Sequence, residues 1–187
     1  MIAYKMFNKD LTCTKGKGRF QYTPGAWIEE KEANCAKNGL HCAGNPLDCL
    51  RYYPAWDEAR CFLVEVEGSV DEDGIDSKIS CTRIRLAKEL SLKQFVAAAA
   101  VYMIQHPHLP ENSLVQHTDG VAGANHFVIC RGQDHLKAKG KAGDVLAILE
   151  EDETGEIVGA RIMEIDGTEF LPGVWYDITG EPAEGTE

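Results

Sequence analysis

Three cysteines at regular spacing are the first residues of this sequence that could bind a metal. Cys35, Cys42 and Cys49 recur every seven residues, and His41 precedes the middle one. Structural zinc sites bring their nitrogen and sulfur ligands in close pairs, about two to four residues apart. No pair here has that spacing, and cysteine is among the residue types most often buried. The pattern favours buried thiols without metal, and whether the four side chains meet in space stays open.

Cys42 is also the candidate for a catalytic thiol, since a reactive thiolate needs a base or a cation beside it. His41 is adjacent in the chain, but neighbours in a strand point to opposite faces. The chain has seven cysteines, an odd number, and its first residues do not resemble a secretory signal. Both features indicate reduced thiols. We therefore predict no catalytic residue, no metal and no cofactor.

Two other polar groups match functional patterns only in part. His117 and Asp119 resemble half of a hydrolytic or metal site, but one such pair in a polar loop is common by chance. Lys137, Lys139 and Lys141 alternate with small residues in a loop that lacks a phosphate-binding pattern. These lysines could contact phosphates directly, so nucleic-acid binding through them is a minor expectation beside that of a solvated loop.

The distribution of charge is the strongest hint of a partner. The chain carries a net charge of -11, and residues 144–187 hold thirteen acids and one base, Arg161. The first sixty residues are almost balanced, with nine Lys and Arg against seven Asp and Glu. A local excess of acid repels nucleic acid and attracts basic protein surfaces, although it can also serve solubility alone.

A hairpin tip within this acidic segment provides the candidate partner-binding residues. The sequence around residues 153–156 is typical of a turn between two strands. Side chains at such a tip are exposed, so they can meet a basic groove at little desolvation cost. The predicted partner-binding residues are Glu150, Glu151, Asp152, Glu153 and Glu156.

The elements that position these residues follow from hydrophobic periodicity. Strand patterns occur at residues 2–7, 19–22, 39–43, 61–68, 78–86, 125–130, 144–150, 157–165 and 174–179. Asn45 and Pro46 begin a short helix over about 46–53. Apolar residues at helical spacing predict a second helix over about 92–105, buried on most sides. The fold class is α+β, with mainly antiparallel sheets around that buried central helix.

The domain organisation is expected to be simple. Residues 1–179 are predicted to form a single α+β domain, with possible sub-parts 1–107 and 108–179. Residues 180–187 have the composition of a flexible acidic tail. The longest apolar run, residues 95–104, is about half of a membrane span. We therefore expect a cytoplasmic protein that makes no contact with a membrane.

Several segments in this order resemble a domain family carried by phages, prophages and gut bacteria. They are Tyr4-Lys-Met-Phe7, Lys9-Asp-Leu-Thr-Cys13, Gly39-Leu-His-Cys42, Asn45-Pro-Leu-Asp48, Tyr52-Tyr53-Pro54, Val64-Glu-Val-Glu-Gly68, and later 143–151, 164–167 and 175–177. The resemblance spans nearly the whole chain and implies a mobile-element origin. Some phage proteins of this size and acidity inhibit bacterial defence enzymes, as anti-CRISPR proteins do.

Such an origin and the acidic segment together lead us to expect a non-enzymatic inhibitor in the cytoplasm of a bacterial host. Its partner would be a host or defence protein with a basic surface, for example a CRISPR-Cas nuclease such as Cas9. The alternative is an ADP-ribosyltransferase-like enzyme or an inactive remnant of one. Residues 39–43, 45–53 and 61–66 are similar to a strand–helix–strand segment of those enzymes. The chain departs from them because it lacks a catalytic Glu and the NAD-binding aromatic or His in matching positions.

Overall fold

The chain folds into two compact units, Met1–Ser91 (unit 1) and Leu92–Glu187 (unit 2). The computed structural model describes residues 1–16, 18–35 and 37–184. The α+β class with mainly antiparallel sheets is confirmed. The division differs from the expected sub-parts, which placed the central helix with the earlier strands. The helix belongs to unit 2, because it packs on the sheet of that unit.

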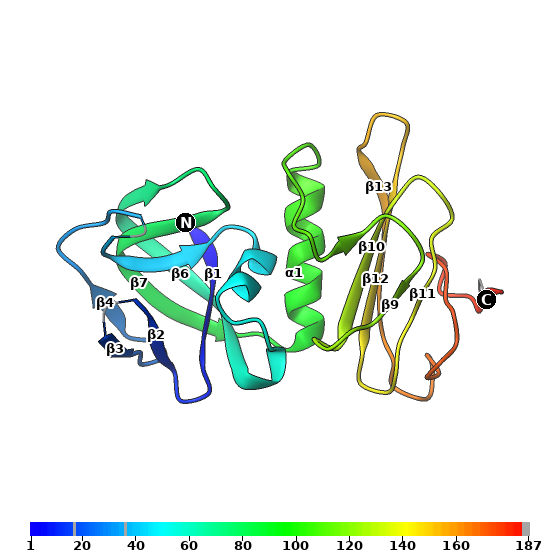
Figure 1. Cartoon of the computed structure of the whole chain (residues 1–187), viewed down its shortest axis with the longest axis horizontal. Coiled ribbons are helices and arrows are strands. Elements are labelled where there is room, and N and C mark those ends of the chain that lie inside the picture. The colour runs from blue at the N-terminus through cyan, green and yellow to red at the C-terminus, as the bar shows by residue number, and fades with distance from the viewer. Residues whose placement is uncertain (17, 36, 185–187) are drawn as a thin grey trace. The chain divides into compact units, whose positions relative to one another are not determined.

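A long antiparallel hairpin forms the centre of unit 1 (Figure 1). Its strands are β6 (Ala59–Glu72) and β7 (Lys78–Glu89), both longer than their sequence patterns indicated. The remaining strands of unit 1 are β1 (Ile2–Asn8), β2 (Thr12–Gly16), β3 (Gly18–Gln21), β4 (Trp27–Glu29) and β5 (Leu40–Ala43). Strands β2 and β3 pair with each other and not with the larger sheet.

The larger sheet of unit 1 closes on itself. Its strand order is β4-β7-β5-β1-β6, and β7 also pairs with β6. The pairs β6–β7, β7–β5, β5–β1 and β1–β6 therefore surround a small barrel interior. Two bulges in the β6–β7 pairing allow this bend: one adds Ala87 to β7 opposite Leu63 and Val64, and the other lies in β6 between Glu67 and Val70. Gly68 adopts φ +79° at the second bulge, a backbone conformation that side chains other than glycine rarely adopt.

The barrel interior is filled by inward-facing residues of every main strand. Phe7 lies at its centre, with ring centroids 4.9 Å from Tyr22 and 5.7 Å from Phe62 in edge-on arrangements. Val64 and Ile84, from β6 and β7, are fully buried beside them. Alternation in β1, β6 and β7 predicted these faces, because every second side chain of a strand points to the same side.

The short helix expected over 46–53 is a 3₁₀ helix, η1 (Pro46–Arg51). The Asn45 side chain accepts from the backbone N–H of Leu47 and caps it as predicted. The helix ends two residues early, since 3₁₀ helices are seldom longer than about one or two turns. A second 3₁₀ turn, η2 (Trp56–Glu58), leads into β6.

Unit 2 places one α-helix, α1 (Leu92–Gln105), against a four-stranded sheet. The predicted helix boundaries are confirmed, and Phe95, Val96 and Ala99 are fully buried. The expectation that the helix is buried on most sides is wrong. Val101 is 49% exposed and Ile104 is 41% exposed, because the sheet covers only one stripe of the helix.

The sheet of unit 2 combines parallel and antiparallel pairs. Strands β8 (Val115–Gln116) and β12 (Val145–Glu151) run parallel to β10 (Phe127–Gly132), and β13 (Ile157–Glu164) is antiparallel to β12. Two short strands, β9 (Gly120–Val121) and β11 (Ala138–Lys139), form a parallel pair. Strand β12 is buried on both faces: α1 packs on one, and the chain after residue 164 covers the other.

The covering segment is not the strand that was predicted over 174–179. Tyr176 forms only isolated bridges, to Ala138 and to Pro182. The described part of the expected tail is also bonded, since the N–H of Ala183 donates to the carbonyl of Trp175 at 2.9 Å. Residues 185–187 lie outside the described residues. No helix in the described part of the chain is long and apolar enough to cross a membrane.

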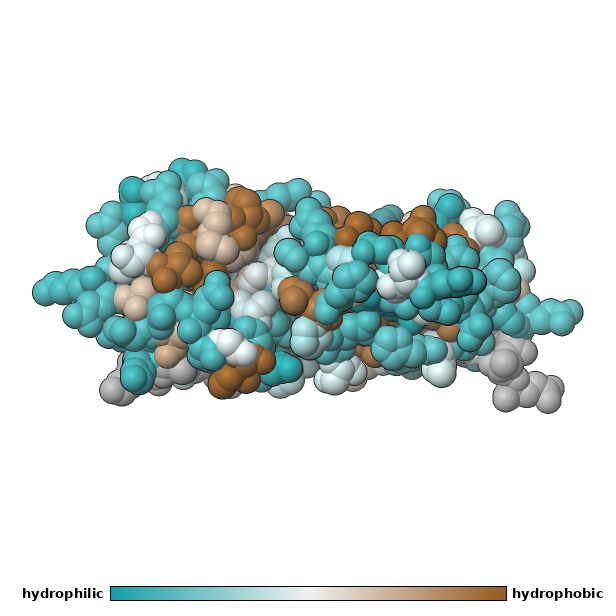
Figure 2. Space-filling view, turned by 90° about the horizontal axis from the view of Figure 1, so that it is seen from above, coloured by the Kyte–Doolittle hydropathy of each residue, from teal (hydrophilic) through white to brown (hydrophobic). Residues whose placement is uncertain are grey.

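Exposed apolar side chains are scattered over both units. Figure 2 shows one face of the molecule, on which hydrophilic side chains predominate and apolar patches remain. The most exposed ones are Met1, Ile2, Ile75, Val121 and Val158. Single exposed apolar residues are usual in soluble domains. They therefore do not mark a site by themselves.

Candidate functional site

Two turns in the acidic segment (residues 144–187) are organised by aspartates. The Asp166 carboxylate accepts from the backbone N–H groups of Thr168, Glu169 and Phe170, at 2.8, 2.9 and 3.2 Å. These bonds lower the pKa of Asp166 to about 2, because they stabilise the charged form. The bond from Thr168 has the largest effect. The loop after β13 is thereby held in one conformation.

Asp177 does the same for the next loop. It accepts from the hydroxyl and the N–H of Thr179 at 2.6 and 2.8 Å, and from the N–H of Glu181 at 3.3 Å. The hydrogen bond from the Thr179 side chain is the largest of the effects that lower the pKa of Asp177. Both aspartates therefore organise their own turns, each through its Oδ1 atom.

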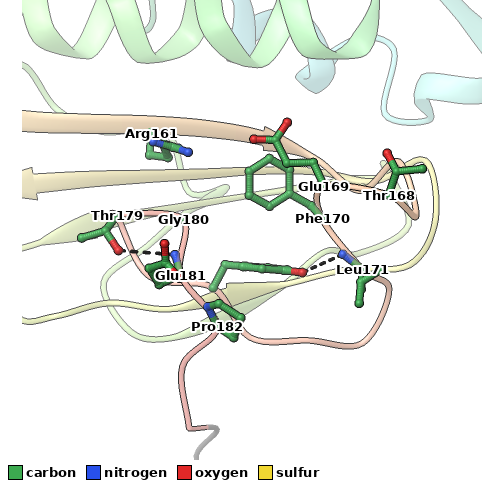
Figure 3. A pocket seen from close by; sticks show the side chains of 10 residues that line it. Arg161, Thr168, Glu169, Phe170, Leu171, Thr179, Gly180, Glu181 and Pro182 are labelled. Atoms are coloured by element: carbon green, nitrogen blue, oxygen red, sulfur yellow. Dashed lines mark hydrogen bonds between the residues drawn. The ribbon is translucent and has the colours of Figure 1, made fainter.

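A pocket of about 350 Å³ lies between these two loops (Figure 3). Phe170 and Tyr176 form its aromatic wall, with ring centroids 5.2 Å apart in an edge-on arrangement. The Tyr176 hydroxyl accepts from the N–H of Leu171 at 2.6 Å, which fixes the ring. The pocket is contained within unit 2, and three charged residues line it: Arg161, Glu169 and Glu181.

Arg161 reaches this pocket from β13 and packs against Gly180. A Cβ atom at residue 180 would lie 2.7 Å from Nη2 of Arg161, so a side chain there would displace the guanidinium. Gly180 also has φ +83°, which favours glycine. The half-buried Arg161 makes no hydrogen bond or ion pair with any described residue. Glu169 and Glu181 are exposed, and their carboxylates are likewise unpaired within the described residues.

The sequence identified Arg161 only as the single base of the acidic segment. It did not predict the pocket, because residues 161–182 meet there through tertiary folding. The pocket lining contains no histidine or cysteine among the described residues. Its guanidinium, two carboxylates and aromatic wall are suited to binding a charged group.

The five predicted partner-binding acids surround the turn between β12 and β13, but they have different environments. Glu153 and Glu156 are exposed, and Glu156 lies 3.0 Å from Nε2 of His108. Asp152 accepts from Thr154 and from the N–H of Glu156, so it organises the turn. Glu150 is half-buried. The expectation of five exposed acids holds only for Glu153 and Glu156.

Glu151 belongs to a buried ion network around Arg131. The Arg131 side chain is 3% exposed and lies 2.5 Å from Glu151 and 2.9 Å from Glu111. It also donates to the carbonyl of Pro107 at 2.7 Å. A charge in this position stabilises the fold only while its partners remain. Glu151 therefore has a structural role that sequence reasoning missed, because its partner lies twenty residues away in β10.

His117 and Asp119 do not form a dyad. Nδ1 of His117 lies 3.0 Å from the carbonyl of Arg131, and Nε2 lies 3.0 Å from Glu111. Asp119 instead accepts from the N–H of Lys137 at 2.8 Å. The two residues connect different loops of unit 2.

The three lysines of the 137–141 loop are used differently from one another. Lys137 donates to the carbonyl of Glu184 at 2.7 Å, and Nζ of Lys139 lies 4.5 Å from the ring centre of Trp175. The backbone N–H of Lys141 donates to Asp144 at 2.7 Å. Two of these side chains therefore contact the C-terminal part of unit 2 itself.

All seven cysteines are thiols, and six of them are buried, with Cys13 half-buried. Cys35 donates to the carbonyl of Lys78 and Cys49 to that of Tyr4. Burial raises the pKa of Cys49 to about 12, which keeps this thiol protonated. Within the described residues, no group of three or more His, Cys, Asp or Glu side chains could hold a metal ion.

Cys42 and His41 alternate across β5 as predicted, with Cys42 in the barrel interior. The pKa of Cys42 is raised well above its usual value. The hydrogen bond with Cys81 is the largest cause, and burial of the thiol is the second. This environment disfavours a thiolate at neutral pH, so it is unlike that of a reactive cysteine.

Lys5 is an unexpected charge inside the barrel of unit 1. It is 6% exposed, and its ammonium donates to the carbonyl of His41. The ammonium also lies 5.4 Å from the ring centre of Phe7 and 5.1 Å from that of Tyr22. It makes no ion pair with a described carboxylate. Ala3, Lys5 and Phe7 alternate along β1 and therefore point to the inner face. The alternation in the sequence could thus have predicted that Lys5 is buried.

A family model for a domain of unknown function, DUF7666, matches residues 1–98, and the chain belongs to that family. The match covers unit 1 and the first half of α1, and the description of the family names no activity. No curated protein and no solved structure matches the chain. The pocket and the acidic segment lie beyond the matched residues.

Proposed function

We propose that this protein is a non-enzymatic binding protein whose acidic segment holds a basic surface of a partner protein. One observation supports this proposal above the others. Glu153, Glu169, Glu181 and Glu184 are exposed, and their carboxylates make no ion pair within the described residues. Because no cation of the same chain offsets these exposed acids, their negative potential can attract a basic surface of another molecule.

The partner class follows from that field. Proteins that act on DNA or RNA present basic grooves, and an acidic surface can occupy such a groove in place of the nucleic acid. The resemblance to a family of phages and prophages leads us to propose a host or defence protein as the partner. A CRISPR-Cas nuclease, bound in the bacterial cytoplasm, is one such target.

A pull-down from bacterial lysate followed by mass spectrometry tests this proposal. The bait is the full chain, and the comparison bait carries Glu153→Gln, Glu169→Gln and Glu184→Gln. We expect a basic protein that is retained by the first bait, depleted with the second, and released as salt rises. Retention that is equal with both baits, or no retained protein, would contradict the proposal.

A matched control separates the acidic segment from net charge. Glu30, Glu58 and Glu72 of unit 1 are also exposed and make no ion pair within the described residues. A variant with Glu30→Gln, Glu58→Gln and Glu72→Gln loses the same total charge and should retain the partner. If this control lost the partner as well, overall charge and not the acidic segment would drive binding.

The ADP-ribosyltransferase-like alternative remains a prediction from the sequence. Strand β5, helix η1 and strand β6 follow in the expected order, but β1 lies between β5 and β6 in the sheet. Incubation of the full chain with labelled NAD and cell lysate tests it directly. Transfer of label to protein would favour an enzyme over the binding function proposed here.

A further inference from the structure

We propose that the pocket around Arg161 binds a basic amino acid or a ligand with the same charges. The ligand carboxylate would lie on the Arg161 guanidinium, and its cationic groups near Glu169 and Glu181. This inference goes beyond the proposed function, because it concerns a small molecule and a pocket within unit 2. It can hold or fail without any protein partner.

Arg161 differs from every other arginine of the chain. The other six each lie within 4 Å of at least one carboxylate: Arg19, Arg51, Arg60, Arg83, Arg85 and Arg131. A guanidinium has five N–H donors, and those of Arg161 form no hydrogen bond with a described residue. A carboxylate is the group that accepts two of them in parallel. No Arg161 nitrogen is among the buried side-chain atoms without a partner, so its N–H groups are accessible to an acceptor from outside the chain.

The acids of the two adjacent loops do not supply that acceptor. Asp166 and Asp177 accept three hydrogen bonds each from their own turns, and neither forms an ion pair with Arg161. Glu169 and Glu181 line the same pocket as Arg161, yet neither forms an ion pair with it. Opposite charges thus line one cavity at separate positions, which is suited to a ligand that carries both signs.

The balance of charge selects among such ligands. The lining contributes one cation and two carboxylates. The complementary ligand carries one carboxylate and two cationic groups, as arginine and lysine do. A neutral zwitterion would satisfy Arg161 and one glutamate, and it should bind more weakly.

The shape of the pocket fits a ligand of this size. Its volume of about 350 Å³ is near the lower end of the range of small-molecule sites. Asp166 and Asp177 hold both loops in place, so the site is formed before the ligand arrives. Preorganised sites lose less conformational entropy when they bind.

The binding test uses L-arginine, L-lysine, L-citrulline and L-argininamide as probes. Citrulline lacks the side-chain cation, and argininamide lacks the carboxylate. Titration is followed by backbone amide chemical shifts, with the full chain at constant ionic strength. We expect saturable shifts at residues 168–171 and 179–181 with arginine or lysine, and affinity at least about tenfold weaker for argininamide.

Three variants assign the charges. Arg161→Gln should abolish arginine binding, Arg161→Lys should weaken it by removing the planar pair of donors, and Glu181→Gln should weaken it by removing one carboxylate. Glu153→Gln, outside the pocket, is the matched control and should bind as the parent does. If Arg161→Gln does not fold, the lysine variant and the argininamide comparison still test the role of the carboxylate.

Three results would overturn the inference. They are equal affinity for argininamide and arginine, unchanged binding by Arg161→Gln, and no saturable shift with any probe up to about 10 mM, where even weak sites are occupied. None of these results bears on the pull-down, because the probe titration contains no partner protein.

Discussion

The two units treat their charges in opposite ways. Unit 1 carries thirteen Lys and Arg against fourteen Asp and Glu, and each of its five arginines lies in an ion pair. Unit 2 carries six Lys and Arg against sixteen Asp and Glu. Its two arginines differ as well, since Arg131 is buried between two carboxylates and Arg161 is unpaired.

The outer face of β7 shows how unit 1 cancels its charges. Arg83 pairs with Glu29 and Glu67 on the neighbouring strands, and Arg85 pairs with Glu65. Both guanidiniums lie over the Trp27 ring, at 4.3 and 4.8 Å. This surface offers a ligand few unsatisfied groups. The acidity of the chain is therefore not uniform: unit 1 pairs every arginine and is almost neutral, whereas unit 2 holds the excess of acids.

The largest effect is expected where unit 2 does pair its charges. Arg131→Met leaves Glu111 and Glu151 without their cation inside the protein. Removing one partner of a buried ion network costs about 3–5 kcal/mol. Urea unfolding of the variant should show this loss. The matched variant of unit 1, Arg83→Met, removes the pairs with Glu29 and Glu67. Because the Arg83 side chain is 38% exposed, the loss should be no more than about 1 kcal/mol.

Equal losses for Arg131→Met and Arg83→Met would remove the contrast between a buried and an exposed pair. Glu151→Gln offers a second check, because it keeps the shape of the side chain while removing its charge. It should also destabilise unit 2, whereas Glu153→Gln at the same turn should not.

Local periodicity predicted much of this architecture from the sequence. The strands at residues 2–7, 61–68, 78–86 and 157–165 and the helix over 92–105 were found because their alternation or helical spacing is strong. The short strands β8, β9 and β11 were missed. A strand of two residues leaves no period to detect.

Of the candidate site, the sequence predicted only the negative charge. The excess of acids in residues 144–187 is visible in the sequence, but which acids are used internally depends on distant partners. Glu151 pairs with Arg131 from another strand, and Asp166 accepts hydrogen bonds from backbone N–H groups. The pocket needs Arg161 and Gly180 to meet, a contact that no local pattern encodes.

The next prediction concerns the turn that supports the pocket. The folded-state pKa of Asp166 is lowered from its usual 3.8 to about 2, chiefly by the N–H of Thr168. A group with a lowered pKa stabilises the fold above its unfolded value, and this contribution is lost as pH falls toward the folded value. Unit 2 should therefore lose stability between about pH 4 and pH 2.

Asp166→Asn should flatten this part of the pH dependence. Asp134, an exposed acid of unit 2, provides the control Asp134→Asn, which should leave the parent profile in place. A carboxyl titration by NMR gives the pKa of Asp166 directly. A midpoint near 4 would show that the turn does not hold this carboxylate.

A smaller effect is expected at the buried cation of unit 1. Unlike Arg131, Lys5 has no carboxylate within the described residues, so Lys5→Met leaves no unpaired acid behind. The variant loses the hydrogen bond to the carbonyl of His41, which destabilises the fold. It also no longer buries a charge, which removes a desolvation cost. These terms oppose each other, and we expect a change within about 1 kcal/mol. A loss as large as that of Arg131→Met would show that Lys5 has a partner that its contacts do not reveal.

The smallest effect is expected at the hairpin tip, where Glu153 and Glu156 are exposed. Each exposed charge pair contributes only a few tenths to about 1 kcal/mol, so single changes are hard to detect in affinity. Their field acts at a distance, however, and it should act mainly on the association rate. Glu153→Gln with Glu156→Gln should slow association with the retained partner and reduce its dependence on salt. Asp152 and Glu151 stay unchanged, because they hold the turn and Arg131. Unaltered kinetics at low salt would mean that the tip is a solvated turn and that the binding acids lie elsewhere in the segment.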